Sequence, residues 1–191
     1  MTRNWKRRTY VKFFVLLAGM LFLIRSCGPQ DIDTILSEKG IPPEQVKLVT
    51  TIEPRTQLVL YQDLTTNNLT PALIQQKLWF SELDKLGGGL HDNPAEPLSS
   101  HISGYEKSKG KMIYIIYGYL HNADITQVNI RYEPDPASAQ VEAEIVESSS
   151  DQSSGRLWYA VIQQPIHEMI WDIKGLNDEG HMIYSSLHSE D

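Results

Sequence analysis

The chain has 191 residues, the length of one ordinary domain, and its hydrophobic fraction of 41% is enough for a packed core and too high for a disordered chain. The first 27 residues carry six basic residues and no acidic one, so the remainder holds 11 Lys and Arg against all 24 Asp and Glu, a formal net charge of −13. Such an acidic body repels phosphate backbones, which argues against a nucleic-acid partner. A single cysteine excludes a disulfide within the chain and a Cys-rich metal site.

The N-terminal segment has the layout of an export signal or a membrane anchor. Five basic residues precede an apolar run over residues 13–24, which lies between Lys12 and Arg25. The positive charge indicates that the N-terminus stays in the cytoplasm and that the body crosses the membrane. A spanning helix needs about 20 apolar residues, but Lys12 and Arg25 can extend their charged ends toward the headgroups, so a thin span is feasible. We therefore expect a cell-membrane protein whose body lies on the extracytoplasmic side.

The end of this segment leaves the kind of anchor open. Residues Ile24-Arg25-Ser26-Cys27-Gly28 resemble a bacterial lipobox, in which the cysteine receives a diacylglycerol and becomes the new N-terminus. Ile24 and Ser26 match that pattern, whereas Arg25 stands where a small or apolar residue is usual, which favours a retained helix. Cys27 is thus a candidate lipidation site, and the alternative is an unmodified cysteine at the outer edge of that helix. Release by ordinary cleavage fits badly, because Ile24 or Arg25 would occupy a small-residue position.

Residues 6–12 also resemble a twin-arginine export signal. Arg7 and Arg8 are followed by a spacer, two apolar residues and a lysine. The apolar run is stronger than in most such signals, and a basic segment yields arginine pairs easily by chance. This export route stays an alternative.

Four segments describe the expected domain organisation. They are a cytoplasmic basic segment and membrane anchor (1–27), a short helix with a proline linker (28–45), an extracytoplasmic β domain (46–185) and a polar tail (186–191).

The second segment predicts one short helix. Ile32, Ile35 and Leu36 recur at helical spacing, and Gly40 is a stop signal. The Pro42-Pro43 pair then breaks the chain, because proline lacks a backbone donor and restricts the residue before it.

Strand signals follow from residue 46 onward. Residues 46–53 and 56–62 flank Pro54-Arg55 and predict a hairpin, and residues 65–68 are typical of a turn. The segment 70–80 is open between helix and strand, but strands on both sides favour a strand. The polar, glycine-bearing stretch 81–110 is long for a structureless loop, so it is mobile, functional or hides a short strand near residues 101–105.

The remaining strands complete the predicted fold. They lie at residues 111–120, 125–132, 139–147, 156–164, 169–176 and 181–185. The first is apolar on both faces, as in a central strand, and the second alternates, with Val128, Ile130 and Tyr132 facing inward. Helix-length segments are missing between the strands, which excludes parallel βαβ units. The pattern predicts a mainly β fold, an antiparallel sheet or two-layer β domain with one short N-terminal helix, preceded by a membrane-anchoring helix.

Three features of the body carry a resemblance. A central strand ends in Tyr117-Gly118, "RLWY" begins at Arg156, and the closing hairpin reads "GLNDEGHMIYS" from Gly175. Together they resemble small, uncharacterised, membrane-tethered β-rich proteins of Gram-positive bacteria, the signal-anchor or lipoprotein type. The resemblance implies an extracytoplasmic β domain and carries over no catalytic residue.

Loop histidines and carboxylates are the weak site candidates. His91, Asp92, Glu96 and His101 share the long polar stretch, and a folded loop can bring them together. Against this, surface histidines in a polar loop are usually just solvated. No pair of histidines has the spacing that presents two ligands on one helix face, so we expect no metal and no cofactor.

Three further features have ordinary structural interpretations beside chemical ones. Glu142 and Glu144 share one face of a predicted strand about 6–7 Å apart, a spacing usable in acid–base hydrolysis, but also typical of a solvated face. The turn 177–180 can touch calcium, although it is ordinary hairpin chemistry. Three tryptophans can line a sugar groove, but core packing suits apolar strands better (Trp79, Trp158 and Trp171).

We expect a membrane-tethered extracytoplasmic domain that binds an envelope protein or a cell-wall component without enzymatic activity. The alternative is a cell-envelope hydrolase that uses carboxylates or loop histidines. A pocket lined by His91, His101 and carboxylates would favour the hydrolase. A filled core with an exposed apolar patch would favour the binding module.

Overall fold

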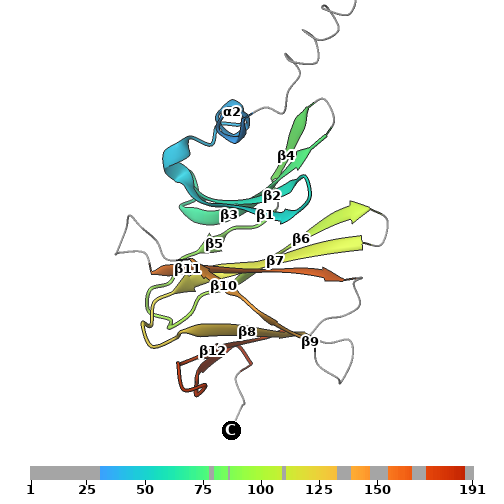
Figure 1. Cartoon of the computed structure of the whole chain (residues 1–191). Coiled ribbons are helices and arrows are strands. Elements are labelled where there is room, and N and C mark those ends of the chain that lie inside the picture. The colour runs from blue at the N-terminus through green and yellow to red at the C-terminus, as the bar shows by residue number, and fades with distance from the viewer. Residues whose placement is uncertain are drawn as a thin grey trace, which may run out of the picture.

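The computed structural model describes residues 31–77, 80–85, 87–108, 111–132, 139–146, 155–164 and 171–187. Within these ranges the chain is mainly antiparallel β-sheet with one short α-helix, as the sequence predicts (Figure 1). The expected anchor and Cys27 lie outside the described residues. None of the helices in the described ranges is long and apolar enough to cross a bilayer.

Helix α2 (Ile32–Glu38) is the predicted short helix. Asp31 occupies its N-cap position, and the chain leaves it through Gly40, whose φ of +74° suits glycine. Seven residues are too few for a stable isolated helix, so packing has to hold it. Ile35 and Leu36 are buried against the first sheet together with Ile41. The proline linker follows as a single 3₁₀ turn, η1 (Pro43–Gln45).

Sheet A is an antiparallel meander below the helix. Its strands are β1 (Val46–Glu53), β2 (Thr56–Asp63), β3 (Asn68–Gln76) and β4 (Ser81–Lys85), paired in that order, with β5 (Leu90–His91) against the start of β3. The predicted hairpin is confirmed, and the strand interpretation of the segment 70–80 is confirmed up to Gln76, while residues 78 and 79 lie outside the described residues. Pro71 is tolerated inside β3 because β4 pairs from Ala72 and β5 pairs up to Leu69, so no strand needs a donor from residue 71 on that side.

Sheet B contains the central strand. Its order is β10 (Glu144–Val146), β11 (Arg156–Gln164), β7 (Lys111–Leu120) and β6 (His101–Ser108). The alternative of a short strand hidden near residues 101–105 is therefore confirmed by β6, whereas β4 and β5, which also lie within residues 81–110, were not predicted. β4 and β6 contain charged residues, which an edge strand tolerates because one of its sides meets solvent.

Sheet C closes the stack. Its order is β13 (Met182–Ser185), β12 (Trp171–Leu176), β8 (Gln127–Tyr132) and β9 (Ala139–Glu142). The sequence predicts one strand over residues 139–147, but the chain changes sheets at Ala143, between β9 and β10. Ala143 is buried and donates its N–H to the Val128 carbonyl at 2.8 Å. Alternation continues through this crossing, so the sequence gives no sign of it.

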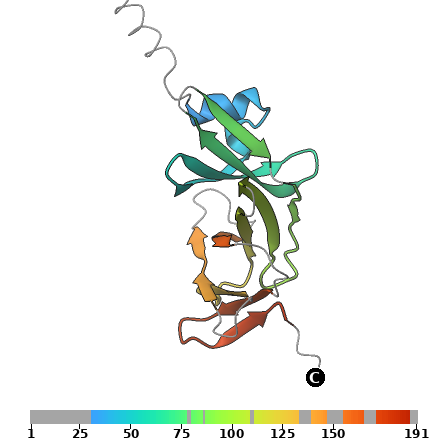
Figure 2. The same ribbon diagram turned by 90° about the vertical axis from the view of Figure 1, so that its right-hand side faces the viewer.

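The three sheets lie in layers, with α2 at one end and sheet C at the other (Figures 1 and 2). One cluster packs α2 on sheet A, a second fills the space between sheets A and B, and a third fills the space between B and C. The expectation of one antiparallel sheet or a two-layer β domain is corrected to three antiparallel sheets. Strand β7 is apolar on both faces because sheet B lies between the other two sheets. Ile115 and Tyr117 face sheet A, whereas Ile116 and Leu120 face sheet C.

Alternation in β8 is confirmed on its inner face. Val128, Ile130 and Tyr132 are buried in the cluster between sheets B and C. On the other face Arg131 is exposed as expected, but Asn129 is buried. Its neighbours across the sheet, Glu142 and Lys174, have longer side chains that can cover it.

The body should fold without the N-terminal segment. All three buried clusters consist of residues from Ile35 to Ile173. We expect a chain that starts at Asp31 to give a β-type circular dichroism spectrum and a cooperative thermal transition. A helix-dominated spectrum, or no transition, would contradict this layered fold.

Candidate functional site

The loop candidates do not form one site. His91 is exposed at the edge of sheet A, where it pairs with Asn68. His101 lies in β6 of sheet B, with its ring edge-on to Tyr117 at a centroid distance of 5.7 Å. Burial lowers the pKa of His101, which therefore favours the neutral ring. The two histidines belong to different sheets, and neither has the other as a partner.

Asp92 has a partner that the sequence did not reveal. Its Oδ1 lies 2.8 Å from Nε2 of His121, which follows the end of β7. The ring of Tyr119 lies beside His121 at a centroid distance of 6.2 Å. This pair joins the segment after β5 to the end of the central strand. It is a long-range contact over 29 positions, so no local spacing signals it.

Glu96 lies apart from that pair. Its Oε1 accepts a hydrogen bond of 2.9 Å from the Asn93 side chain, within one exposed turn. In the part of the chain that the structure describes, no group of three or more His, Cys, Asp or Glu is placed to hold a metal ion.

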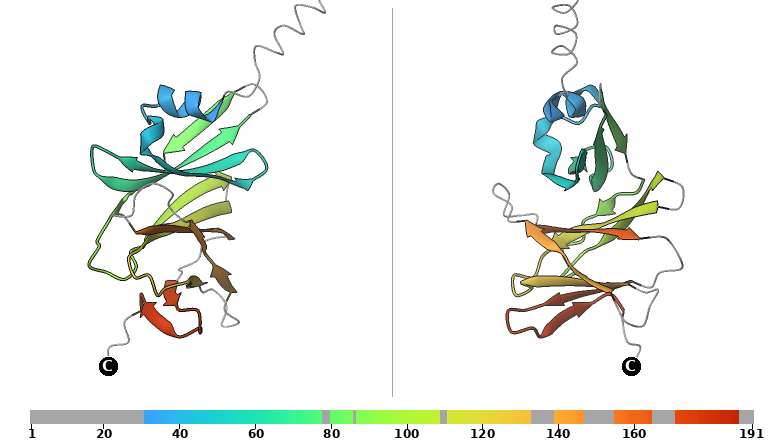
Figure 3. Two further views of the ribbon diagram at one scale, coloured as in Figure 1. Left: turned by 60° about the vertical axis from the view of Figure 1, so that its left-hand side comes forward. Right: turned by 45° about the vertical axis from the view of Figure 1, so that its right-hand side comes forward.

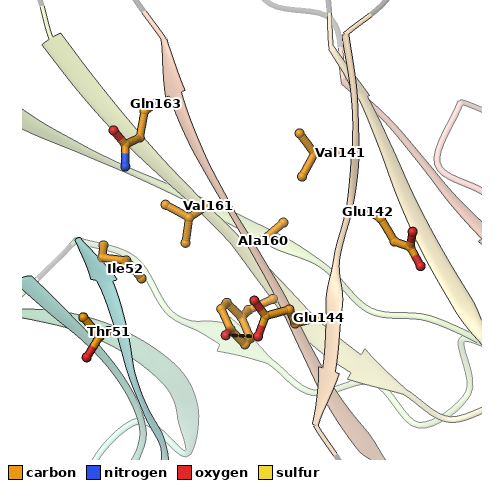
Figure 4. A pocket seen from close by; sticks show the side chains of 9 residues that line it. Thr51, Ile52, Val141, Glu142, Glu144, Ala160, Val161 and Gln163 are labelled. Atoms are coloured by element: carbon orange, nitrogen blue, oxygen red, sulfur yellow. Dashed lines mark hydrogen bonds between the residues drawn. The ribbon is translucent and has the colours of Figure 1, made fainter. Parts of the chain in front are cut away.

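A cleft of about 260 Å³ opens beside the crossing from β9 to β10 (Figure 4). Ile52, Val141 and Val161 form its apolar wall. Its polar groups are the glutamates Glu142 and Glu144 and the side chains of Thr51, Tyr159 and Gln163. The lining is Thr51, Ile52, Val141, Glu142, Glu144, Tyr159, Ala160, Val161 and Gln163.

The two glutamates of this cleft do not act as a facing pair. Glu142 belongs to sheet C and Glu144 to sheet B, and Figure 4 shows their side chains leaving the chain in different directions. The Glu144 carboxylate accepts a hydrogen bond from the Tyr159 hydroxyl. Burial, followed by this carboxylate, raises the pKa of Tyr159, so the phenol remains a neutral donor. The bond between Glu144 and Tyr159 holds β10 on β11, and among the described residues of the cleft no second acid converges on Glu142.

Trp158 and the turn 177–180 have structural roles. Trp158 is fully buried, and its indole N–H donates to the Ser99 carbonyl at 3.2 Å. The side chains of Trp79 and Trp171 lie outside the described residues. In the turn 177–180 the Asn177 side-chain oxygen accepts the N–H groups of Glu179 and His181, so it serves the hairpin.

Three exposed apolar side chains lie together on the outer face of sheet C, whereas the other exposed ones in the described residues, Val49, Leu64 and Phe80, lie elsewhere. Met182 is 60% exposed, Leu187 50% and Ile183 39%, and we call these three residues the outer patch. They line a shallow hollow of about 530 Å³ together with Asp172, Lys174, Tyr184 and Ser185. Apolar side chains that lie together on an exposed surface often mark a binding site, whereas single scattered ones are normal.

The polar groups of this hollow neutralise one another. Asp172 is buried, accepts a hydrogen bond of 3.0 Å from the Ser185 hydroxyl, and lies 3.3 Å from Lys174 Nζ. The hollow therefore presents apolar groups around a satisfied ion pair. The sequence predicts a hairpin at residues 181–185 but not the exposure of its apolar side chains. Whether one face of a strand is buried depends on whether another layer packs on the sheet that the strand joins.

No family model, curated protein or solved structure matches this chain. A functional conclusion therefore has to come from the chain's own residues.

Proposed function

We propose that this protein is a membrane-tethered, non-enzymatic module on the extracytoplasmic side, which binds an envelope protein through the outer patch. The basic and apolar N-terminal segment supports the tether. The exposed outer patch is the observation that carries the binding function.

The position of the outer patch fits a tethered module. The described chain begins with α2 at one end of the stack, and β12 and β13 form the other end (Figures 1 and 2). An anchor that precedes Asp31 leaves sheet C as the layer farthest from the membrane along the stack. The outer patch then faces away from the lipid surface, which argues against the membrane as its ligand.

The chemistry of the outer patch favours a protein over a wall glycan. Met182, Ile183 and Leu187 offer aliphatic and thioether surface, and methionine adapts its shape to a partner. The nearby polar groups of Asp172, Lys174 and Ser185 already bond to one another, so few are free to bind sugar hydroxyls. An apolar protein surface suits this hollow best.

Photo-crosslinking in intact wall-less cells tests the proposal. A photoreactive amino acid replaces Met182 in the full chain, and we expect a discrete adduct with one envelope protein. Protease added to the same cells should digest both the body and the adduct, because both lie outside.

Two variants make this experiment specific. The same photoreactive residue at Glu38, which is exposed on α2 at the opposite end, should give no such adduct. Leu187→Asp should lower the Met182 adduct about tenfold or more, since a charge in an apolar contact has to be desolvated. Protection from protease would overturn the location, and an adduct insensitive to Leu187→Asp would overturn the binding surface.

A further inference from the structure

We propose that β13 pairs edge to edge with β13 of a second copy, so that two four-stranded sheets C become one continuous sheet across a two-fold axis. The inference rests on the proposed tether and does not depend on the envelope partner. It is carried by the chemistry of the β13 edge and by the geometry of the stack.

The β13 edge lacks two of the features that usually protect open strands, namely charged residues and prolines. Very short length and β-bulges also protect edges, and β13 has four residues and a bulge opposite Gly175 and Leu176. The other edges in the described ranges have one of these features: β1, β4, β6, β9 and β10 each contain charged residues, and β5 has only two residues. Met182–Ser185 contains no charge and no proline, and the chain continues with Ser186 and Leu187.

The backbone of β13 offers hydrogen-bonding groups to a neighbour. Ser186 donates its N–H to Ile173 of β12 at 2.9 Å, and Ser185 pairs with Lys174. In an antiparallel ladder, successive residues direct their N–H and C=O groups to opposite sides. The backbone groups of Ser185 therefore point away from β12, toward the open edge.

The stack satisfies a geometric condition that the membrane imposes. Two copies with anchors in one membrane can be related only by a two-fold axis that is normal to the membrane. Antiparallel pairing of two identical edge strands requires a two-fold axis perpendicular to the joined sheet. Because the sheets stack face to face, that axis runs along the stack (Figure 3). Both copies then direct α2 toward the same membrane and both outer patches away from it.

A second copy is the occupant that these observations favour. An isologous contact places identical residues near one another, so an uncharged edge avoids like-charge repulsion. Tethering also confines the copies to one surface in one orientation, which raises their effective concentration. The resulting sheet presents two outer patches side by side.

Co-purification of two differently tagged full-length copies tests the proposal. The tags are placed at the N-terminus, away from β13, and membranes are solubilised in mild detergent. We expect the wild-type copies to purify together. Ser185→Pro in both copies removes one edge-facing donor per copy and should lower recovery of the second copy about tenfold.

Ser185→Ala is the matched control. It removes the hydroxyl that bonds Asp172 but keeps the backbone N–H, so the copies should still purify together. Loss of pairing in both variants would mean that the hairpin, and not the edge, had been damaged, and would overturn the assignment.

A charge exchange at Ile183 decides the geometry. Ile183→Lys in both copies should abolish co-purification through repulsion across the axis, and Ile183→Glu in both should do the same. One Lys copy with one Glu copy should restore it. Pairing in all three combinations, or no wild-type pairing, would overturn the edge-to-edge contact. If the copies do not pair but Met182 still forms an adduct with an envelope protein, the proposed function stands and only the pairing is overturned. If the copies pair but no adduct forms, the pairing stands and the envelope partner is overturned.

Discussion

Gly118→Ala is expected to destabilise the body by at least about 3 kcal/mol, which corresponds to a fall of roughly 10 °C in Tm for a domain of this size. A Cβ at this position would lie 1.8 Å from the Ser99 carbonyl oxygen and 2.9 Å from Trp158 Nε1. The oxygen belongs to a backbone, so a side-chain rotation cannot relieve the overlap. Thermal unfolding of the chain that starts at Asp31 measures the effect.

The neighbourhood explains why the structure cannot yield at Gly118. Gly118 pairs directly with Trp158 across sheet B, and the Trp158 indole donates to the same Ser99 carbonyl. The Ser99 N–H in turn donates to the Tyr119 carbonyl at 2.9 Å. The Tyr119 N–H also donates to the Ser99 hydroxyl at 3.2 Å, so moving Ser99 away would break three hydrogen bonds of a buried segment.

Gly87→Ala is the matched control. A Cβ at Gly87 meets nothing within 4 Å, and its φ is not in the left-handed region. We expect a change in stability of less than about 0.5 kcal/mol. Equal losses in the two variants would show that β7 does not approach Ser99 as closely as described.

Stability is also expected to fall steeply at alkaline pH. Burial raises the pKa of Tyr117 and of Tyr119 to about 12, from an ordinary value of 10.0. Both rings lie in the cluster between sheets A and B. In this pH range the phenol keeps its proton in the folded state but loses it in the unfolded state. The free energy of unfolding therefore depends on pH there.

The sign follows from the direction of these two shifts. Below pH 10 both phenols are neutral in the folded and unfolded states, so their contribution to stability is fully present. Between pH 10 and 12 the unfolded chain binds fewer protons, and the free energy of unfolding falls by about 1.4 kcal/mol per pH unit for each phenol. The two together predict a loss of about 5 kcal/mol by pH 12. Denaturant unfolding at stepped pH measures this slope.

The Tyr117→Phe/Tyr119→Phe double variant isolates the cause. It keeps both rings in the core but removes the titrating hydroxyls, so we expect a markedly flatter alkaline slope. Ultraviolet titration should show the two phenols ionising only when the wild-type chain unfolds. An unchanged slope in the double variant would assign the alkaline loss to other groups.

The sequence was sufficient for the local features of this fold. Alternation at Val128, Ile130 and Tyr132 and the turn at Pro54-Arg55 depend on neighbouring residues, and the structure has these elements where they were predicted. The short helix before Gly40 was predictable for the same reason. Periodicity and turn chemistry are local, so they survive in the sequence alone.

Residues that carried the resemblance also acquire a physical meaning. Gly118 and the tryptophan of "RLWY" meet at Ser99, where both lie against one backbone carbonyl group. From the sequence they were only a loose pattern. Their role depends on the pairing of β7 with β11, which brings together positions 40 residues apart.

The sequence by itself determined an acidic, mainly β body behind a basic and apolar N-terminal segment, with one short helix and its hairpins. Only the tertiary structure decided that there are three sheets, that the chain changes sheets at Ala143, that Asp92 meets His121, and that β13 is an uncharged open edge. The physical reason is that strand pairing and layer stacking join residues far apart in the chain. Alternation fixes which residues share a strand face, but only the assembled sheets decide whether that face meets another layer or solvent.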